Sequence, residues 1–281
     1  MATLGSWPAR SAVLILLPPS EAKAAGGTGA SLRAAGLSRP GPYGLGGARR
    51  QVLETVSALC RSDPVAATST LRLPGGTATE DLAANIAMLD APTMPALDRF
   101  TGVIYLAMDA AGLTARQRRA ALASVHIFSG AFGLLRADEP VPLHRVPAAA
   151  AIPPIGGLTA YWRAHLREAA PSLFAPGSLL VDLRSTDYAA LWQVTGPLRA
   201  SVTPVRVLVE RRVGRKWVRR TLSYQSKLGK GLLARELIVA AAAGHAARTP
   251  ADVAAAGERV GYVAEPRTLP GQTGVDLVIR A

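Results

Sequence analysis

Cysteine is nearly absent from this sequence: Cys60 stands alone among 281 residues, so no disulfide can form within the chain. There is also no CxxC motif and no cluster of histidine with cysteine of the kind that zinc and iron–sulfur sites require. The four histidines are scattered, and no two of them have the spacing of metal ligands. We therefore expect no metal site, no cofactor and a reducing, cytoplasmic environment.

Long hydrophobic runs are absent as well. The longest run near the N-terminus, Ala12–Leu17, has six residues, whereas a membrane helix needs roughly 20. The run is also shorter than the core of a typical signal peptide. We interpret it as a strand buried on both faces, which ends at Pro18 and Pro19, rather than as a secretion signal, and we expect no membrane partner.

Acidic residues are few, and the basic excess is concentrated in one part of the chain. The sequence has 32 Lys and Arg but 19 Asp and Glu, which gives a net charge of +13. The segment from Arg199 to Arg235 contains eleven basic residues and a single acidic one, Glu210. Such a cluster favours a polyanionic partner. The alternative is a solvated surface of an arginine-rich protein that has no such partner.

Hydrophobic patterning predicts an α+β protein in which helices wrap a mixed sheet. Short apolar or alternating runs predict strands at residues 12–17, 100–106, 179–183, 205–209 and 217–224. Helical spacing predicts helices at residues 49–60, 80–89, 158–168 and 232–243. We expect a single domain over residues 12–281 and a flexible N-terminal extension over residues 1–11. The glycine-rich segment 24–48 is interpreted as a mobile loop over the mouth of the fold.

One segment predicts two helices joined by a glycine turn. Thr114 and Gln117 form a capping box, which starts the first helix. That helix is expected to stop at Ser129 and Gly130, and a second short apolar helix follows. In this helix-hairpin-helix-like element, the amides around Ser129, Gly130 and Gly133 would bind a DNA phosphate without reading bases. The alternative is a C-capping glycine that only turns the chain.

A second candidate anion site lies in the basic segment. Lys227 and Lys230 flank glycines in a turn before the helix predicted at 232–243. Free amides and the partial positive charge at the helix N-terminus would converge with these lysines on one phosphate. Arg235, one turn further on, can contact a phosphate through two N–H groups. The alternative is that Lys227, Lys230 and Arg235 are surface residues that only confer solubility.

Polar residues that follow the predicted strands form the floor of the expected cleft. Lys23 follows the strand at 12–17, and ligands of open sheets usually bind where strands end. The other polar residues at these strand ends are Ser20, Asp182, Ser185, Asp187 and Tyr188. A carboxylate there could orient Lys23 or act in acid–base chemistry, and a structural ion pair is the alternative.

Six segments spread along the chain carry a family resemblance. They are PPSEAK at 18–23, FTGVIYLAMD at 100–109, FSGAFGLLR at 128–136, VDLRSTDY at 181–188, KLGKGLLAR at 227–235 and GY at 261–262. In this order they resemble the YaaA family (DUF328/UPF0246, peroxide stress resistance), from about residue 12 over nearly the whole chain. The chain departs from the family pattern where Glu21 is inserted, where Ala137 replaces a proline and where His144 replaces a tyrosine.

The resemblance implies the fold described as cantaloupe, in which helices wrap a central set of strands and leave a cationic cleft. It implies a bacterial, cytoplasmic protein of the oxidative stress response. Such a protein would bind duplex or branched DNA without sequence preference and limit iron-dependent oxidative damage. Arg136 and Arg145 lie on the family motifs, and we expect both to contact phosphate rather than to form structural ion pairs. We expect a monomer.

Two other functions remain open. The first is an enzyme that acts on a nucleotide, a damaged DNA base or another phosphorylated small molecule, with Lys23, Asp187 and Tyr188 in the cleft. The second is a scaffold for an acidic partner protein. We favour DNA binding because the sequence shows no complete catalytic constellation.

Overall fold

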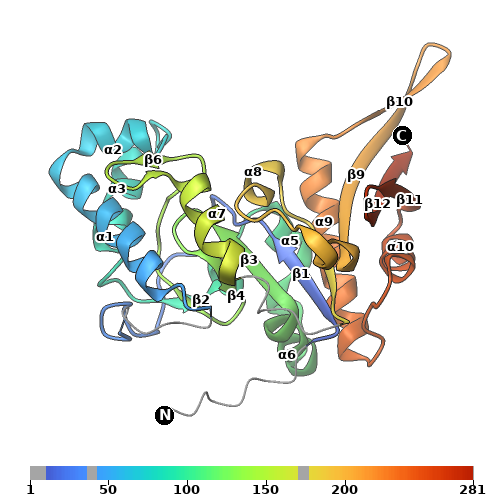
Figure 1. Cartoon of the computed structure of the whole chain (residues 1–281), viewed down its shortest axis with the longest axis horizontal. Helices are drawn as coiled ribbons and strands as arrows, with labels where there is room; N and C mark the ends of the chain where they lie inside the picture. Colours follow the sequence, from blue (N-terminus) through green and yellow to red (C-terminus); the bar gives the residue numbers. More distant parts are fainter. Residues whose placement is uncertain (1–10, 37–42, 170–176, 281) are drawn as a thin grey trace.

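An eight-stranded sheet runs through the molecule and carries its core (Figure 1). The computed structural model describes residues 11–36, 43–169 and 177–280, so residues 1–10 of the expected N-terminal extension lie outside the described range. The strand order across the sheet is β11-β12-β9-β8-β1-β3-β4, and β10 pairs with the end of β9.

The sheet is mainly parallel. Its strands are β1 (Val13–Leu17), β3 (Val125–Ser129), β4 (Gly133–Arg136), β8 (Leu179–Asp182), β9 (Val202–Val213), β10 (Lys216–Arg220), β11 (Val263–Leu269) and β12 (Gln272–Arg280). Five neighbouring strands run parallel, and β4, β10 and β11 run antiparallel to their partners. Two short pairs stand apart, β2 (Met94–Pro95) with β5 (Pro140–Val141) and β6 (Ala151–Ile152) with β7 (Gly156–Gly157). The expectation of a mixed sheet with helices is thus confirmed.

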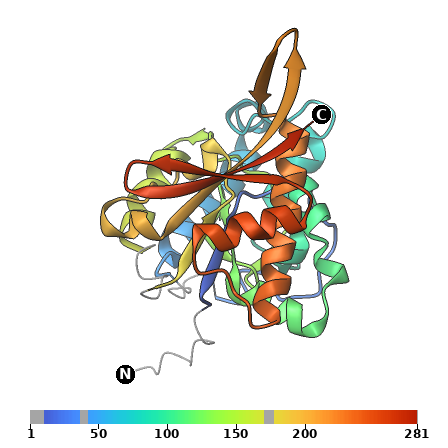
Figure 2. The ribbon, with the colours of Figure 1, turned by 90° about the vertical axis from the view of Figure 1, so that its right-hand side faces the viewer.

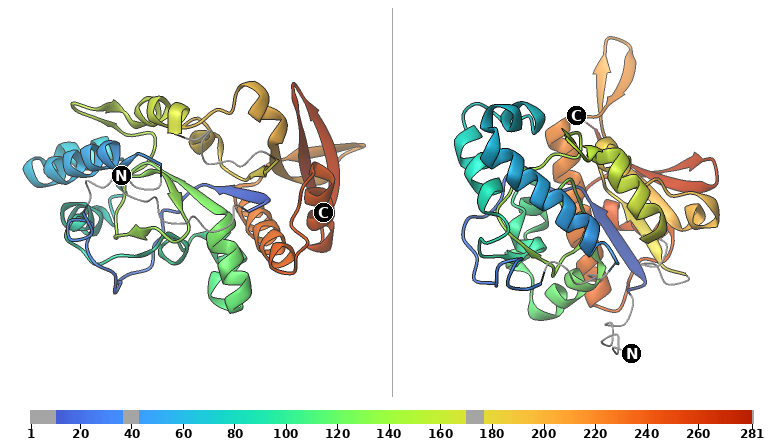
Figure 3. Two further views of the ribbon diagram at one scale, coloured as in Figure 1. Left: turned by 60° about the horizontal axis from the view of Figure 1, so that its bottom comes forward. Right: turned by 60° about the vertical axis from the view of Figure 1, so that its left-hand side comes forward.

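Helices lie along the sheet as well as at both of its ends. They are α1 (Gly46–Ser62), α2 (Pro64–Thr70), α3 (Ala78–Ala87), α4 (Ala96–Arg99), α5 (Val103–Met108), α6 (Ala115–Ser124), α7 (Leu158–Ala169), α8 (Thr186–Ala189), α9 (Ser223–Ala242) and α10 (Pro250–Arg259). Figure 3 shows α1 to α3 at one end of the molecule and α9 with α10 at the other. α9 is the central helix of its end, because α5, α6, α10 and β9 all pack against it.

Several elements form where the sequence predicts them. The strands β1 and β8 and the helices α1, α3 and α7 match their predicted ranges to within a few residues. The capping box that starts α6 is also confirmed. The Thr114 hydroxyl accepts a hydrogen bond from the Gln117 amide at 3.3 Å, and the Gln117 side chain accepts one from the Thr114 amide at 2.9 Å.

The strand predicted at residues 100–106 is wrong, because α5 begins at Val103 and Phe100 makes only an isolated bridge with Lys23. An uninterrupted apolar run does not by itself distinguish a strand from a buried helix. Two contacts favour the helix here. The Tyr105 hydroxyl donates to the Pro18 carbonyl oxygen at 2.7 Å, and α5 packs closely on α9.

The glycine turn after α6 joins two strands rather than two helices. α6 ends at Ser124, and β3 then enters the sheet beside β1, with Ile15 opposite Val125. β4 returns antiparallel, with Ser129 opposite Gly133. Pairing with β1 satisfies the backbone hydrogen-bonding groups of this apolar segment. Its sequence is also compatible with helical spacing, so the pattern alone does not distinguish a strand from a helix. The helix-hairpin-helix-like element predicted at this place is therefore wrong.

The turn and helix start predicted at Lys227 and Lys230 are also wrong, because both lysines lie inside α9. β10 ends at Arg220, and α9 begins at Ser223. Gly229 and Gly231, on either side of Lys230, serve packing instead of a turn. A Cβ on Gly231 would lie 2.3 Å from the Ile104 carbonyl oxygen, so only glycine allows α9 to approach α5 this closely.

Residues 29–33 of the glycine-rich segment lie along residues 89–93. The Gly29 amide donates to the Thr93 carbonyl at 2.8 Å, and the Arg33 amide donates to the Leu89 carbonyl at 3.0 Å. Arg33 also forms an exposed ion pair with Asp90. Backbone hydrogen bonds therefore hold residues 24–36 to the body of the protein, and residues 37–42 lie outside the described range.

Candidate functional site

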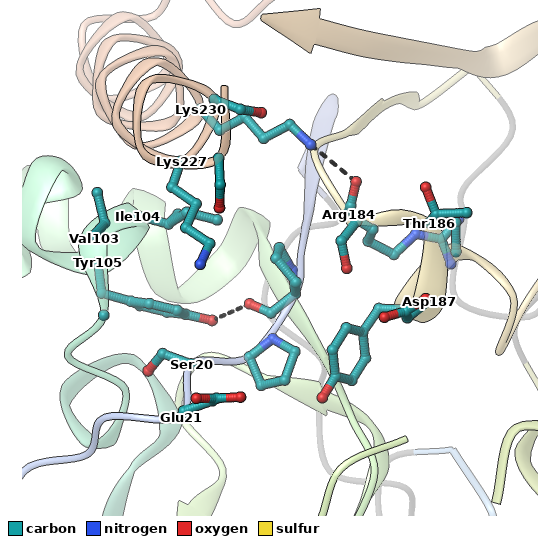
Figure 4. Close-up of a pocket in the computed structure, with 18 of the residues that line it drawn as sticks. Ser20, Glu21, Val103, Ile104, Tyr105, Arg184, Thr186, Asp187, Lys227 and Lys230 are labelled. Atoms are coloured by element: carbon teal, nitrogen blue, oxygen red, sulfur yellow. Dashed lines mark hydrogen bonds between the residues drawn. The ribbon is translucent and has the colours of Figure 1, made fainter. Parts of the chain in front are cut away.

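A cavity of about 970 Å³ lies where three neighbouring parallel strands end (Figure 4). β1 ends at Leu17, β3 at Ser129 and β8 at Asp182, and the segments that follow β1 and β8 turn into the cavity. α5, α8 and the first half of α9 complete its walls. Ligands of open sheets are expected at this edge, outside the carboxyl ends of the strands.

Most of the predicted site residues line this one cavity, although they come from distant parts of the chain. The predicted residues that line it are Ser20, Lys23, Ser129, Arg145, Asp182, Ser185, Asp187, Tyr188, Lys227 and Lys230. The predicted residues that do not line it are Gly130, Gly133, Arg136 and Arg235. No described residue of the glycine-rich segment 24–48 lines the cavity either.

Lys23 places a buried amine at the cavity wall. Its Nζ donates to the carbonyl oxygens of Ser20, at 3.0 Å, and of Glu21, at 3.3 Å. Burial and the nearby Arg145 guanidinium lower the pKa of Lys23 to about 8. A substantial fraction of this amine is therefore neutral at mildly alkaline pH.

Lys227 and Lys230 project from α9 toward the cavity, as Figure 4 shows. Lys227 is exposed, and among the described residues it has no carboxylate partner. Lys230 donates to the Arg184 carbonyl oxygen at 3.0 Å, and burial lowers the pKa of its amine. The two lysines, one turn apart, add positive charge to the same wall of the cavity.

Asp182 is held as a carboxylate by Arg184, two residues further on. Its Oδ1 accepts from the Arg184 amide at 3.0 Å, and the two side chains form a bidentate pair at 2.9 and 2.7 Å. Burial alone would raise the pKa of Asp182, but the Arg184 guanidinium holds it below its ordinary value. The Arg184 guanidinium also lies 4.3 Å from the centre of the Phe128 ring. This geometry fits a structural ion pair on the cavity floor.

The remaining floor residues offer hydroxyl groups and one exposed carboxylate. Burial raises the pKa of Tyr188 to about 12, so its hydroxyl stays protonated at neutral pH. Ser185 precedes the first residue of α8, and the side chain of Asp187 is exposed. The Ser20 hydroxyl donates to the Ala22 carbonyl oxygen at 2.5 Å and fixes the turn after β1.

Arg145 lines the cavity in a paired state. Its guanidinium lies 3.0 Å from the carboxylate of Glu21, which is mostly exposed. The Arg145 amide donates to the Asn85 side chain at 2.7 Å, and this bond fixes its backbone. Glu21 is the residue inserted relative to the family pattern, so in this chain the inserted acid shields one of the expected phosphate contacts.

The glycine turn has a packing role beside the cavity. The amides of Ala131 and Phe132 donate to the Ser129 hydroxyl at 3.2 and 3.4 Å, so both are already satisfied. A Cβ on Gly130 would lie 2.4 Å from the Val146 carbonyl oxygen. Gly133 has a φ of +69°, and a Cβ there would meet the Trp162 ring at 2.5 Å. This geometry favours the alternative that these glycines only turn and pack the chain.

Arg136 and Arg235 point to other parts of the structure. Arg136 lies on β4, and its guanidinium makes a bidentate contact with Asp138 at 2.9 and 2.6 Å. Arg235 donates to the carbonyl oxygens of Met108 and Asp109 at 2.9 and 2.7 Å, at the end of α5. Arginine commonly stabilises the free carbonyls at a helix C-terminus in this way.

Among the cavity-lining residues that sequence reasoning did not select are Arg184, Arg206 and His144. Arg184 could have been found, because it directly follows a predicted buried strand beside Asp182. Arg206 lies in a predicted strand of alternating residues, where nothing in the sequence marks it as a site residue. In the structure it pairs with Asp276 on β12. His144 is buried against the rings of Phe100 and Phe132. Burial and the nearby Lys23 lower the pKa of His144 well below its ordinary value, so its ring is neutral.

Three further features concern metal, membrane and thiol chemistry. Among the residues that the structure describes, no three His, Cys, Asp or Glu side chains are grouped closely enough to hold a metal ion. Within the same ranges, no helix combines the length and apolar content that crossing a bilayer requires. Cys60 is buried as a free thiol in α1.

Known proteins match the chain over most of its length. The model of the family described as peroxide stress protein YaaA matches residues 13–267. A UPF0246 protein of Streptomyces coelicolor is 38% identical over 253 residues, which are 90% of this chain and 92% of the relative. A UPF0246 protein of Corynebacterium efficiens is 35% identical over 248 residues, 86% of this chain and 91% of the relative. One of Corynebacterium glutamicum is 34% identical over 257 residues, 90% of this chain and 95% of the relative.

Proposed function

The chain belongs to the peroxide stress protein YaaA family, and on this premise we propose that it acts in the oxidative stress response by binding DNA through phosphate contacts at the cavity. One observation carries the proposal. Lys23, Lys227 and Lys230 surround one cavity, and none has a carboxylate within ion-pair distance among the described residues. Lysine ammonium groups are common partners of phosphate.

The charge balance of the cavity supports a polyanionic ligand. Six basic side chains line it, from Lys23, Arg145, Arg184, Arg206, Lys227 and Lys230, against three acidic ones, from Glu21, Asp182 and Asp187. The N-terminal end of α9 lies at the same wall through Ser223 and Ser226, and its helix dipole adds partial positive charge. Both effects favour a phosphate over a neutral ligand.

The size of the cavity limits how DNA is bound. A volume of about 970 Å³ accommodates a phosphate with its sugar or one unstacked nucleotide, whereas a duplex is far larger. We propose that duplex or branched DNA lies across the mouth and places part of its backbone in the cavity. The lysines contact phosphate oxygens, which carry no sequence information. In this proposal, DNA binding itself limits iron-dependent oxidative damage.

A salt series tests this function. Affinity for a fluorescent duplex is measured by anisotropy at several potassium chloride concentrations, and its logarithm is expected to fall by about 0.9 per neutralised phosphate for each unit of log salt. Lys227→Glu is expected to weaken binding and reduce this slope. Arg167→Glu is the matched control, because Arg167 is an exposed cation on α7 outside the cavity. An affinity that does not change with salt concentration, or equal effects of the two variants, would contradict the proposal.

A second candidate function rests on the chemistry of Lys23. A buried amine with a pKa near 8 is a better nucleophile at neutral pH than an ordinary lysine. Its nitrogen could attack the C1′ aldehyde of an abasic nucleotide and form a carbinolamine. Loss of water would then give an imine that links protein to DNA. The protein would in this case act on damaged DNA rather than only bind it.

Borohydride trapping separates binding from this chemistry. Hydride reduces an imine to a stable amine, so an abasic duplex would become covalently attached to the wild-type protein and migrate with it in a denaturing gel. Lys23→Gln would abolish the adduct, and Arg167→Gln, outside the cavity, would retain it. Absence of any adduct with the wild type would remove the enzymatic candidate and leave the binding function untouched.

A further inference from the structure

β9 extends beyond the strands that flank it. The last residue of β9 that pairs with β8 is Pro204, and the last that pairs with β12 is Glu210. Beyond Glu210, β9 pairs with β10 alone. We name residues 211–220 the arm; Arg219 and Arg220, opposite Glu210 and Val209, lie at its base. Figures 1 and 2 show the arm projecting away from the rest of the molecule.

The arm carries a dense and unneutralised positive charge. Its ten residues include six basic ones and no acidic one. Arg219 is paired with Glu210 and Glu265, and this pairing anchors the base of the arm to the sheet. The exposed cations Arg211, Arg212, Arg215, Lys216 and Arg220 have no carboxylate partner within the described part of the chain. Five free cations on so short a ribbon strongly attract an anion.

The strand register assigns these cations to faces of the arm. Val218 is opposite Arg211, and Arg220 is opposite Val209, so cross-strand neighbours and alternate residues place Arg211, Lys216 and Arg220 on one face. Val205 and Val207 share the parity of this face and line the cavity. Pro204 and Arg206, of the other parity, line the cavity as well, so β9 as a whole continues from one wall of the cavity outward into the arm.

β10 leads directly back to the cavity. Thr221 and Ser223 follow its last residue and line the cavity, and Lys227 lies one turn further along α9. The arm also exposes apolar surface: Val213 is 62% exposed and Trp217 is 60% exposed. Trp217 is opposite Arg212, on the face of the arm away from Arg211 and Lys216. The arm therefore offers cations on both faces and one exposed ring, which match the phosphates and the sugar and base surfaces of a nucleic acid.

We propose that the arm is a second DNA contact, which holds the backbone of a duplex whose neighbouring segment enters the cavity. This inference rests on the proposed function and extends it from the cavity to a surface outside it. A two-stranded ribbon has the dimensions to enter the major groove of B-DNA. Charge complementarity and continuity with the cavity wall favour DNA over an acidic protein as the occupant.

A comparison of two triple variants tests this inference. The arm variant Arg211→Gln, Lys216→Gln, Arg220→Gln removes three cations from one face. The control Arg116→Gln, Arg119→Gln, Arg167→Gln removes three exposed cations of α6 and α7 and changes the net charge equally. Affinity for a duplex of about 25 base pairs and its salt dependence are measured for both variants, for Lys227→Met and for the wild type.

The arm variant is expected to lose about 2 to 3 units of salt slope, and with it on the order of a hundredfold or more in affinity at about 100 mM salt. The control is expected to stay within about threefold of the wild type. Equal losses in the two triple variants, with Lys227→Met still weakened, would overturn the arm inference and leave the proposed function standing. A wild type that binds no DNA would overturn both. Because the substituted side chains are exposed, unchanged melting temperatures would show that folding is intact.

Discussion

Lys230 on α9 donates a hydrogen bond of 3.0 Å to the backbone carbonyl oxygen of Arg184, which lies just after β8. This bond closes the cavity between the helix and the end of the strand, as Figure 4 shows. Lys227, one turn away, makes no such bond in the described part of the structure. The two lysines therefore contribute similar charge to the cavity but differ in their structural role.

This difference predicts different effects of two similar substitutions. Lys230→Met loses a partly buried hydrogen bond and is expected to lower the free energy of unfolding by about 1 kcal/mol. Lys227→Met is expected to stay within about 0.5 kcal/mol of the wild type. Both should weaken DNA binding, because each removes one cation. Chemical denaturation and anisotropy on the same samples measure the two effects, and equal stabilities would show that the Lys230 bond contributes nothing.

The lowered pKa of Lys23 predicts a pH-dependent stability. At pH values between about 8 and the ordinary 10.5, the unfolded chain holds a proton that the folded chain has released, so stability rises with pH in this window. Lys23→Met lacks this contribution. As the pH rises through this window, the free energy of unfolding of the wild type is expected to increase relative to that of the variant. The increase over the whole window is up to about 3 kcal/mol. Urea denaturation from pH 7 to pH 10 measures the difference, and a constant difference would exclude a lowered pKa.

Close packing between α5 and α9 predicts that Gly231 cannot be replaced. Alanine favours helix by up to about 1 kcal/mol over glycine. At position 231, however, its Cβ would lie 2.3 Å from the Ile104 carbonyl oxygen, and overpacking typically costs about 1–3 kcal/mol. Gly231→Ala is therefore expected to lower the melting temperature. Gly47→Ala in α1 is the control, because no atom lies within 4 Å of its Cβ and the substitution is expected to be neutral or stabilising.

The pair between Asp182 and Arg184 predicts a non-additive response. Arg184→Met leaves a buried carboxylate without its partner and is expected to cost about 3–5 kcal/mol. Adding Asp182→Asn removes the unpaired charge and is expected to recover part of this loss. A double-mutant cycle in urea measures the coupling. Additive losses would mean that the two side chains act independently.

Local signals predicted those elements that depend on few residues. The capping box at Thr114 is complete within four residues, and it forms as expected. The apolar run at residues 12–17 is followed directly by two prolines, and it forms β1. The position of the cavity was predicted from the general rule that ligands of open sheets bind where strands end. Lys23 and Asp187 do line the cavity.

Elements decided by distant partners could not be predicted in this way. Val125–Ser129 is a strand because it pairs with β1. Nothing in the sequence of the segment itself indicates this pairing. The glycines of α9 resemble turn residues, but the reason for Gly231 is a carbonyl oxygen on α5, more than 100 positions away. The directions of Arg136 and Arg235 likewise depend on Asp138 and on the end of α5.

Because the cavity joins strand ends with the first half of α9, it depends on parts of the chain that a ribosome makes far apart in time. A nascent chain lacks this wall, with Lys227 and Lys230, until residues 223–242 have emerged and docked. Any ligand of the cavity therefore selects complete molecules and shifts the folding equilibrium toward them.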